Sequence, residues 1–218
     1  MLCIKRVHTA ALREKIYRLR YRAYRKENAI PENAAGRFQD AFDEQPNHVL
    51  WALADGDRII GAVRTTWFDP AEPHLIPEMH AYGDDLRRAI PAGARICSGN
   101  RLVTDPDLAL TTSRFALLLM RLSVFTAGQK GADWQITTAR SNHLKFYRRV
   151  FGCPVVSEGK LYPGLQCKMS LMAMRFDLVS QWIRDHLPCM QPRGYEGMFL
   201  DPACRHLWEQ GHPVEAAA

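Results

Sequence analysis

The first regular pattern of apolar and polar positions lies near the N-terminus. Apolar residues recur every three or four positions from Leu12 to Ala23, as they do on the buried face of a helix, and Thr9 can cap its start. We therefore predict a helix from Thr9 to about Lys26. The polar residues 28–46, which include Pro and Asn, indicate a long loop with at most short helical pieces.

The next pattern predicts a β-hairpin. In "HVLWALADGDRIIGAVRTTWF", residues 48–68, two β-branched or aromatic runs flank Asp55-Gly56-Asp57. Residues 69–94 then contain four prolines around a possible short helix from Gly83 to Ile90. A Pro-rich insertion beside a sheet is either a lid or an ordinary surface connection, and the pattern alone favours neither.

The second half of the chain alternates strand and helix patterns. A strand around "ICSGNRLV" precedes a helix from Arg114 to about Gln129, and the strand "ADWQITTA" precedes the helix "NHLKFYRRVF", which Gly152 ends. The strand "LQCKMSLMAM" and the helix "LVSQWIRDHL" follow. This alternation requires crossover connections and a partly parallel sheet, and the early hairpin makes the sheet mixed. The predicted class is α/β, or α+β with a mixed sheet.

Length and composition are consistent with one domain. The chain has 218 residues, 47% of them hydrophobic, which is enough for a packed core. We assign residues 1–187 to the domain and residues 188–218 to an irregular extension packed on it. We recognise no integral membrane segment and no signal-peptide pattern, so we expect a cytoplasmic protein.

Cysteine spacing and net charge limit the kinds of metal, ligand and binding partner that we expect. Six scattered cysteines without a C-x-x-C pair indicate reduced structural thiols, and Cys189, Cys204, His206 and His212 fit no zinc spacing, so we predict no metal. The net charge of +6 suits an acidic partner such as a nucleic acid, an anionic membrane, a phosphorylated cofactor or an acidic carrier protein. We expect no nucleic acid, because neither a basic tail nor an RNA-binding aromatic motif is present.

The candidate chemistry lies in charged residues inside apolar runs. Arg64 interrupts "IIGAVRTTW" and Arg101 interrupts "ICSGNRLV", and a guanidinium in a strand interior requires carboxylate partners or an anionic ligand. Asp40 and Asp43 share one side if their loop has a helical turn, and Arg20 lies on the first helix. These residues form either an internal ion network or a binding site. Nucleotide-hydrolase and serine-esterase motifs are absent.

Four blocks give the chain a family resemblance. "LRYRAYRKE", "FQDAFDE", "IGAVRTT" and "SGNRLV" occur in this order, and with the following strand, helix and final strand they resemble the acyl-homoserine-lactone synthases and the bacterial N-acyl amino acid synthases. The resemblance covers roughly residues 12 to 174. It implies a GNAT-like acyltransferase fold, with a splayed mixed β-sheet flanked by helices.

The resemblance also implies roles for the charged residues. Arg101 matches the arginine of a motif E-x-S-R-F/L and is assigned to the catalytic group, whereas Ser98 stands where that motif has Glu and Asn100 where it has Ser. A glutamate there would be the natural acceptor for a proton from an amine, so the identity of the base is open. The positions that match substrate-binding residues of the family are Arg20, Tyr24, Asp40 and Arg64.

The implied reaction forms an amide from an amine and an acyl thioester. It needs a neutral amine, a donor for the oxyanion and a proton for the leaving sulfur, but no covalent enzyme nucleophile. We assign Asp43 to hold or deprotonate the ammonium, directly or through a water that Ser98 orients. Tyr147 either protonates the sulfur or merely packs its ring on the sheet. The oxyanion contact is assigned to the backbone N–H groups of Leu102, Val103 and Thr104.

The residues after "ICSGNRLV" bear on the thioester donor. Acetyl-CoA-dependent GNAT enzymes usually carry Q/R-x-x-G-x-G/A here, but "RLVTDPDLALTTSRF" has no glycine, and Asp105 and Asp107 add negative charge. The helix start still offers groups for one phosphate, as in phosphopantetheine, from Thr111, Thr112, Ser113 and Arg114. An acyl carrier protein is therefore favoured over CoA. Four basic residues either dock this acidic protein or simply form a solvated helix surface: Arg114, Arg121, Arg148 and Arg149.

The leading hypothesis is an autoinducer synthase-like N-acyltransferase that moves a fatty acyl group from an acyl carrier protein to a small amine or amino acid. It needs no permanently bound cofactor, only acyl-phosphopantetheine or acyl-CoA as co-substrate. The alternatives are an acetyl-CoA-dependent GNAT acetyltransferase and a non-catalytic acyl-binding module. Because Ser98 and Arg101 are three apart, a regular strand would turn them to opposite faces; we predict that a bulge at Gly99 brings both to one cleft.

Overall fold

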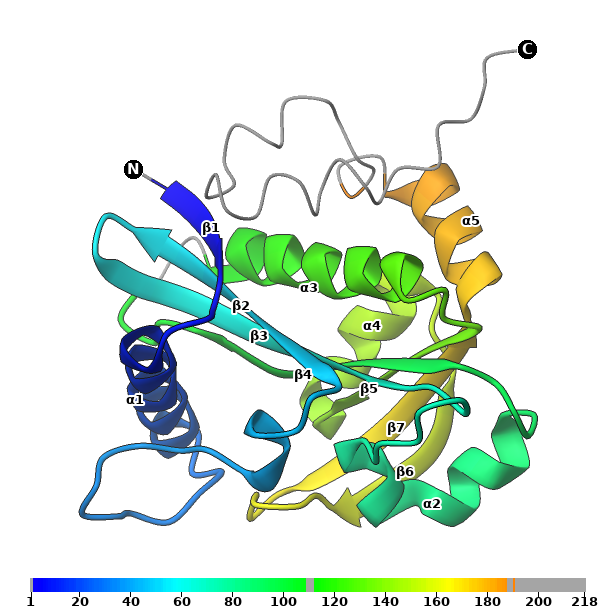
Figure 1. Cartoon of the computed structure of the whole chain (residues 1–218), viewed down its shortest axis with the longest axis horizontal. Helices are drawn as coiled ribbons and strands as arrows, with labels where there is room; N and C mark the ends of the chain where they lie inside the picture. The colour runs from blue at the N-terminus through cyan, green and yellow to red at the C-terminus, as the bar shows by residue number, and fades with distance from the viewer. Residues whose placement is uncertain (1, 109–111, 188–189, 191–218) are drawn as a thin grey trace.

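The computed structural model describes residues 2–108, 112–187 and 190. Within them, seven strands form one mixed sheet in the order β1-β2-β3-β4-β5-β7-β6, with helices on both faces (Figure 1). The strands are β1 (Leu2–Arg6), β2 (His48–Asp55), β3 (Arg58–Phe68), β4 (Ile96–Thr104), β5 (Trp134–Ala139), β6 (Val155–Leu161) and β7 (Lys168–Arg175). The helices are α1 (Ala10–Lys26), α2 (Pro77–Ala89), α3 (Thr112–Gln129), α4 (Leu144–Phe151) and α5 (Phe176–His186), with short 3-10 helices η1 (Ala41–Asp43) and η2 (Ser141–His143).

Several sequence predictions fall outside this range. The proposed extension from 188 to 218 is described only at Met190, so its packing stays a prediction. Cys189, Cys204, His206 and His212 also lie outside the described residues. Among the described helices, none combines the length and apolarity that crossing a bilayer requires.

The sheet is mixed, as predicted, and it opens at its centre. β4 runs parallel to β5, while the other neighbouring strands are antiparallel. The β4–β5 pairing begins at Ile96↔Trp134 and ends at Gly99↔Thr137. Beyond that point β4 continues beside β3 and β5 continues beside β7. The sheet is therefore splayed between β4 and β5, as the family resemblance implied.

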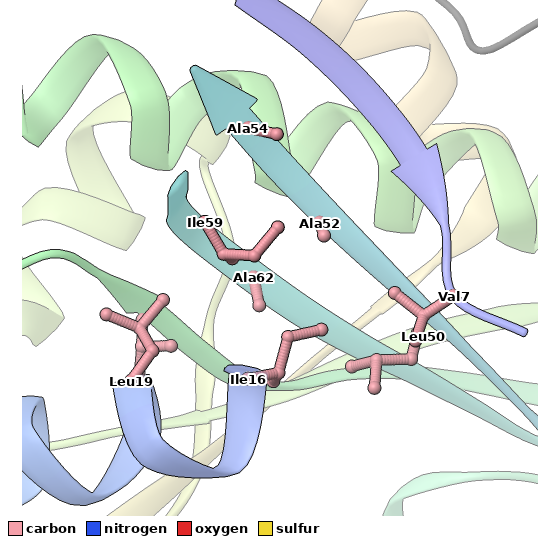
Figure 2. Close-up of a cluster of buried hydrophobic side chains, with 9 residues drawn as sticks. Val7, Ile16, Leu19, Leu50, Ala52, Ala54, Ile59 and Ala62 are labelled. Carbon is pink, nitrogen blue, oxygen red and sulfur yellow. The ribbon is translucent and has the colours of Figure 1, made fainter. Parts of the chain in front are cut away.

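Helix α1 covers one face of the first half of the sheet. Thr9 caps it by accepting a hydrogen bond from the Leu12 N–H at 3.3 Å. Ile16 and Leu19 point from the helix toward strand residues that include Ala52 and Ala62 (Figure 2). Small strand residues let the helix approach closely, and each buried aliphatic side chain contributes about 1.5–3 kcal/mol. This packing fixes the position of Arg20, the next residue along the helix.

The opposite face is covered by α3, α4 and α5. Leu119 and Leu122 of α3 pack on the first half of the sheet. Gly99 lies against this helix: a Cβ there would meet the Ser123 Oγ at 2.5 Å. The glycine is therefore required because helix and strand lie so close together.

The predicted bulge exists, but not at Gly99. The β3–β4 register shifts between Ala62, which pairs with Val103, and Arg64, which pairs with Asn100. Residues 101 and 102 of β4 therefore lie opposite the single residue 63 of β3, and Arg101 has a left-handed φ of +52°. A residue in this conformation is typical of the first position of a bulge. The prediction of its position was wrong because the register is set by pairing with β3, which one strand's sequence does not show.

The two strands that the sequence pattern missed lie at the two edges of the sheet. Among the described strands, β1 pairs only with β2, and β6 pairs only with β7. Both carry charged residues and side chains that are mostly not fully buried. Edge strands bury one side poorly and use charges to discourage further pairing, so their hydrophobic pattern is weak.

Helix α2 begins six residues earlier than predicted. Pro77 occupies its first turn, where proline is favoured because its missing N–H would be unpaired anyway, and a kink at Tyr82 (φ −128°, ψ 20°) divides the helix. Ile76 and Tyr82 are fully buried against Ile136 and Leu171 of the sheet. Residues 69–94 are therefore more than a surface connection, because they complete the core beside β4, β5 and β7.

Candidate active site

Five charged residues predicted from the sequence meet on the face of the sheet that carries α1 and α2. Arg20 comes from α1, Asp40 caps η1 and Asp43 is its last residue, Arg64 lies on β3 and Arg101 on the β4 bulge. Arg20, Asp43 and Arg64 are fully buried, and Arg101 is nearly so. The ion network that the sequence analysis held open is therefore present.

Asp43 is bonded to two guanidiniums and to the backbone at the start of η1. Both of its oxygens accept from the Arg20 Nη1, at 2.9 and 2.8 Å, and its Oδ1 lies 3.0 Å from the Arg64 Nη1. Its Oδ2 also accepts from the Asp40 N–H at 3.0 Å. Burial alone would raise the pKa of Asp43, but the two guanidiniums outweigh it and lower that pKa.

Asp40 joins Arg64 to Arg101. Both terminal nitrogens of Arg64 donate to it, and Arg101 contacts its Oδ2 through Nε at 2.8 Å and Nη2 at 2.7 Å. Asp40 also accepts from the Phe42 N–H, which caps η1. Burial opposes ionisation of Asp40, yet the surrounding guanidiniums hold its pKa well below its usual range.

The polar side chains of β4 share this face. The Arg64 Nε donates to the Asn100 Oδ1 at 2.7 Å, and the Asn100 amide donates to the Thr66 Oγ1 at 2.9 Å and to the Ser98 Oγ at 3.4 Å. Ser98 is fully buried. Ser98 and Asn100 face one side because they alternate along the strand, and the bulge turns Arg101 to the same side. The structure therefore places Ser98 and Arg101 on the same face of the sheet.

Arg101 is held between aromatic rings in an unfavourable backbone conformation. Its guanidinium lies 5.0 Å from the Phe38 ring and 5.4 Å from the Tyr162 ring, and its Nη2 donates to the Pro163 carbonyl at 2.9 Å. Tyr24 lies edge-on to Phe38 at 5.3 Å, so the predicted aromatic residue borders the site. A left-handed non-glycine residue persists only where surrounding contacts compensate its strain.

The cluster carries surplus positive charge. Arg20, Arg64 and Arg101 supply three guanidiniums, whereas Asp40 and Asp43 supply two carboxylates. Among the described residues, the Arg20 Nε and Nη2 are buried without a hydrogen-bond partner. A buried donor without an acceptor is costly, so these two N–H groups favour an anionic ligand beside α1.

The sequence analysis missed Glu78, a third carboxylate on this face. Glu78 lies in the first turn of α2, is fully buried, and accepts a hydrogen bond from the Tyr162 hydroxyl at 2.7 Å. Its Oε2 has no hydrogen bond of normal geometry, but Ser98 is close enough to lower the pKa of the carboxyl. Burial outweighs this and raises that pKa. The pattern "IPE", with Pro77 opening a helix, was the available sign of an earlier helix start.

Tyr147 lies on the other face, at the point where β4 and β5 part. Its ring packs with Ala139 and Met172, and its hydroxyl interacts with the Thr137 side chain, which itself donates to the Gly99 carbonyl at 2.9 Å. Burial raises the pKa of Tyr147 to about 12, so its hydroxyl stays protonated at neutral pH.

The predicted oxyanion and phosphate groups are only partly described. Leu102, Val103 and Thr104 lie beyond the last β4–β5 pair, so in the described structure their β5-facing edge has no strand partner. Thr111 lies outside the described residues, and Thr112 and Ser113 begin α3, where their side chains are not described. Arg114 is exposed in the first turn of that helix.

The structure changes two expectations about charge near the site of the acyl donor: the negative charge of Asp105 and the exposure of Arg121. Asp105 is fully buried and is paired with Arg22 at 3.2 Å and Arg58 at 2.7 Å, so its negative charge is neutralised internally. Arg121 was expected on the basic surface, which is wrong: it is 9% exposed and donates to the Met190 carbonyl. On α3, Arg121 faces Met190 and not the solvent, whereas Arg148 and Arg149 of α4 are exposed.

Comparisons with known proteins agree with the observed fold. Residues 15–175 match the family described as N-acyl amino acid synthase FeeM. The structure of FeeM, an N-acyl amino acid synthase from uncultured soil microbes, aligns with a TM-score of 0.69 and 15% identity over 86% of this chain and 96% of that chain. No curated protein matches.

Two CoA-dependent acyl-homoserine lactone synthases have the same fold. BjaI, with MTA, aligns with a TM-score of 0.59 and 14% identity over 92% of this chain and 93% of that chain. MesI aligns with a TM-score of 0.58 and 19% identity over 91% of this chain and 99% of that chain. These likenesses confirm the GNAT-like fold predicted from the sequence.

Proposed function

This chain belongs to the N-acyl amino acid synthase (FeeM) family of acyltransferases, and on that basis we propose that it transfers an acyl group from a thioester to the amine of an amino acid. The observation that carries this proposal is the buried charge cluster beside α1. The buried, unpartnered Nε and Nη2 of Arg20 match a carboxylate, and an amino acid brings a carboxylate next to its amine.

We infer that the amino acid and the thioester bind at different parts of the sheet. The amino acid binds on the face of Arg20, Arg64 and Asp40, with Tyr24 bordering the site. The thioester enters the opening between β4 and β5, where the segment of Leu102, Val103 and Thr104 turns the N–H groups of its free edge to the developing oxyanion. Tyr147, protonated and placed at the end of the β4–β5 pairing, gives the leaving sulfur its proton.

Asp43 fits the role of an electrostatic anchor in this reaction. Its two oxygens already accept from Arg20, Arg64 and the Asp40 N–H, and its pKa is lowered. A carboxylate in this state holds positive charge well but takes a proton poorly. It attracts the substrate ammonium into the cluster, and Arg101, bound to Asp40, keeps η1 in place.

An acyl carrier protein is the donor that we favour. The segment from Arg101 to Phe115 has no glycine to let the backbone approach a pyrophosphate, and Arg114, Arg148 and Arg149 are exposed on the helices beside the opening. Acyl-CoA is the second candidate, because Asp105 is neutralised by Arg22 and Arg58. The similar structures BjaI and MesI are CoA-dependent synthases.

Mass spectrometry can test both the activity and the donor. Lipid extracts of bacteria that overexpress the chain should contain new N-acyl amino acids, and the purified chain should form them faster from acyl carrier protein than from acyl-CoA of the same acyl length. Turnover of acetyl-CoA without such products would contradict the proposal, and acyl binding without any product would leave only a binding module.

A charge-matched pair of variants tests the docking of the carrier protein. Arg148→Ala with Arg149→Ala should lower kcat/KM for the acyl carrier protein and leave that for acyl-CoA unchanged, because only the protein donor spans the helix surface. Arg87→Ala with Arg88→Ala, which removes the same charge from the exposed side of α2, is the control. Equal losses in both double variants would show that docking is not located on α4.

A further inference from the structure

We propose that Glu78 is the group that takes the proton from the substrate ammonium. This inference rests on the proposed function and assigns a base that the sequence of β4 does not supply. It follows from the position of the carboxylate among the described side chains, from its bonding and from the charges around it.

The position of Glu78 is fixed from two sides. On one side Tyr162, whose ring contacts Arg101, donates to the Glu78 Oε1 at 2.7 Å. On the other side Ser98 interacts with the carboxyl and is bonded to Asn100, which is bonded to Arg64. Glu78 therefore links Tyr162 and Arg101 on one side to Ser98 and Asn100 on the other. It lies beside the last residues of β4 that pair with β5.

The bonding of Glu78 leaves one oxygen for a substrate. Oε1 is occupied by the Tyr162 hydroxyl, and Oε2 is buried with no hydrogen bond of normal geometry among the described residues. Asp43, the other fully buried acid of this site, has both oxygens occupied by Arg20 and the η1 cap. A base needs a lone pair that can reach the proton, so the geometry selects Glu78 over Asp43.

The charges of the site also select Glu78. With Arg20, Arg64 and Arg101 facing Asp40 and Asp43, an ionised Glu78 would bring the count to three cations and three anions. Burial raises its pKa, while the Tyr162 hydrogen bond, Ser98 and Arg64 favour the ionised form. A carboxylate with a raised pKa accepts a proton more readily than Asp40 or Asp43, whose pKa values are lowered.

The proposed acyl transfer begins with the substrate ammonium. The ammonium N–H bond breaks and its proton moves to the Glu78 Oε2, which leaves a neutral amine. The amine nitrogen forms a bond to the thioester carbon, and the C–S bond breaks as the tetrahedral intermediate collapses. Tyr147 gives its proton to the sulfur and is restored by the second proton that the nitrogen loses, so the products are an amide, a free thiol and the proton on Glu78, which water removes afterwards.

Access of a substrate amine to Glu78 requires the first turn of α2 to shift. Glu78 is fully buried, and the kink at Tyr82 separates residues 77–81 from the rest of the helix. The far part of α2 is tied down by the bond from the Tyr82 hydroxyl to the Met169 carbonyl at 2.6 Å. The first turn is therefore the part of the helix that can shift without loss of this bond.

A pH profile compared between wild type and a Glu78 variant isolates Glu78 from the groups that interact with its charge. The groups that act on it or feel its charge are Tyr162, Tyr82, Cys97, Ser98 and Arg64. Burial raises the pKa of Tyr162, Tyr82 and Cys97 above their usual values, and carboxylate partners raise that of Arg64. An acid limb that belongs to Glu78 should therefore disappear when its carboxylate is replaced.

The test compares Glu78→Gln with Asp84→Asn, an acid-to-amide change on the exposed side of the same helix. Glutamine can still accept from Tyr162, so we expect normal folding, an amine KM within a few-fold of wild type, and a kcat lower by about 10²–10⁴-fold. The acid limb of kcat/KM should be lost, Glu78→Asp should recover part of the rate, and Asp84→Asn should behave as wild type.

The outcomes separate this inference from the proposed function. A folded Glu78→Gln protein with wild-type kcat and the same acid limb would overturn the inference and leave the acyltransferase intact. A wild-type chain that forms no amide from any thioester would overturn both. If Glu78→Gln does not fold, Tyr162→Phe decides: a retained acid limb shifted in pH, because a hydrogen bond to the ionised form is lost, supports Glu78, and an unshifted profile overturns it.

Discussion

Removing the Arg101 guanidinium should destabilise the chain by an amount that its contacts define. Arg101 makes two contacts to the Asp40 Oδ2, at 2.8 and 2.7 Å, and one to the Pro163 carbonyl at 2.9 Å. Breaking a buried ion pair by removing one partner costs about 3–5 kcal/mol. The low end applies here, because Asp40 keeps Arg64 and its side chain is 15% exposed.

The backbone of residue 101 adds a second, separable contribution. Its φ of +52° is left-handed, a conformation that costs a non-glycine residue about 1–2 kcal/mol. Arg101→Ala keeps this strain and loses the ion pair, whereas Arg101→Gly loses both. We therefore expect losses in the free energy of unfolding of about 3 kcal/mol for Arg101→Ala and about 2 kcal/mol for Arg101→Gly.

Urea denaturation at neutral pH, followed by circular dichroism, measures this difference. For a domain of this size the losses correspond to Tm decreases of about 6–12 °C and about 4–8 °C. In Asp40→Asn the cost of Arg101→Ala should shrink, because no buried charge is left unpaired. A loss below about 0.5 kcal/mol for Arg101→Ala would refute the buried ion pair. A less stable Arg101→Gly than Arg101→Ala would refute the strain argument.

Three further predictions concern stability. Thr9→Ala should lower the free energy of unfolding by about 1 kcal/mol through loss of the α1 cap, and a Thr9→Ser variant that unfolds like wild type in urea is the control. Gly152→Ala should cost more than about 1 kcal/mol, because φ is +62° and the new Cβ would lie 2.8 Å from the Trp182 Cε3; an unchanged thermal midpoint would contradict this. The lowered pKa values of Asp40 and Asp43 stabilise the fold above their unfolded pKa of about 4, and this contribution is lost as pH falls below it, so Asp40→Asn should flatten the acid limb of stability against pH; an equally steep limb in the variant would contradict it.

The central part of the fold could be predicted from the sequence because its strands are buried on both faces. The hairpin of β2 and β3, the strand β4 and the helix α1 carry strong apolar patterns, and all of them were predicted close to their observed bounds. β1 and β6 were missed because edge strands are partly exposed and carry charges. Their existence depends on a neighbouring strand more than on their own composition.

The residues of the candidate site could be predicted only where a charged residue interrupts the apolar pattern of a single strand or helix. Arg64 and Arg101 stood out because they interrupt apolar strands, and both are buried in the ion network. Glu78 gave no such sign, since its neighbours Ser98 and Tyr162 are 20 and 84 residues away and meet it only through tertiary packing. The position of the bulge at Arg101 depended in the same way on pairing with β3.

The central claim is that this sheet brings an amino acid and an acyl thioester together and joins them. The most direct test incubates the purified chain with an acyl thioester and isotopically labelled amino acids, and quantifies amide and free thiol in the same reaction. We expect one amide for each thiol released, with no thiol released when amino acids are omitted. Thiol release with free fatty acid as the product, at a rate that amino acids do not change, would contradict the account.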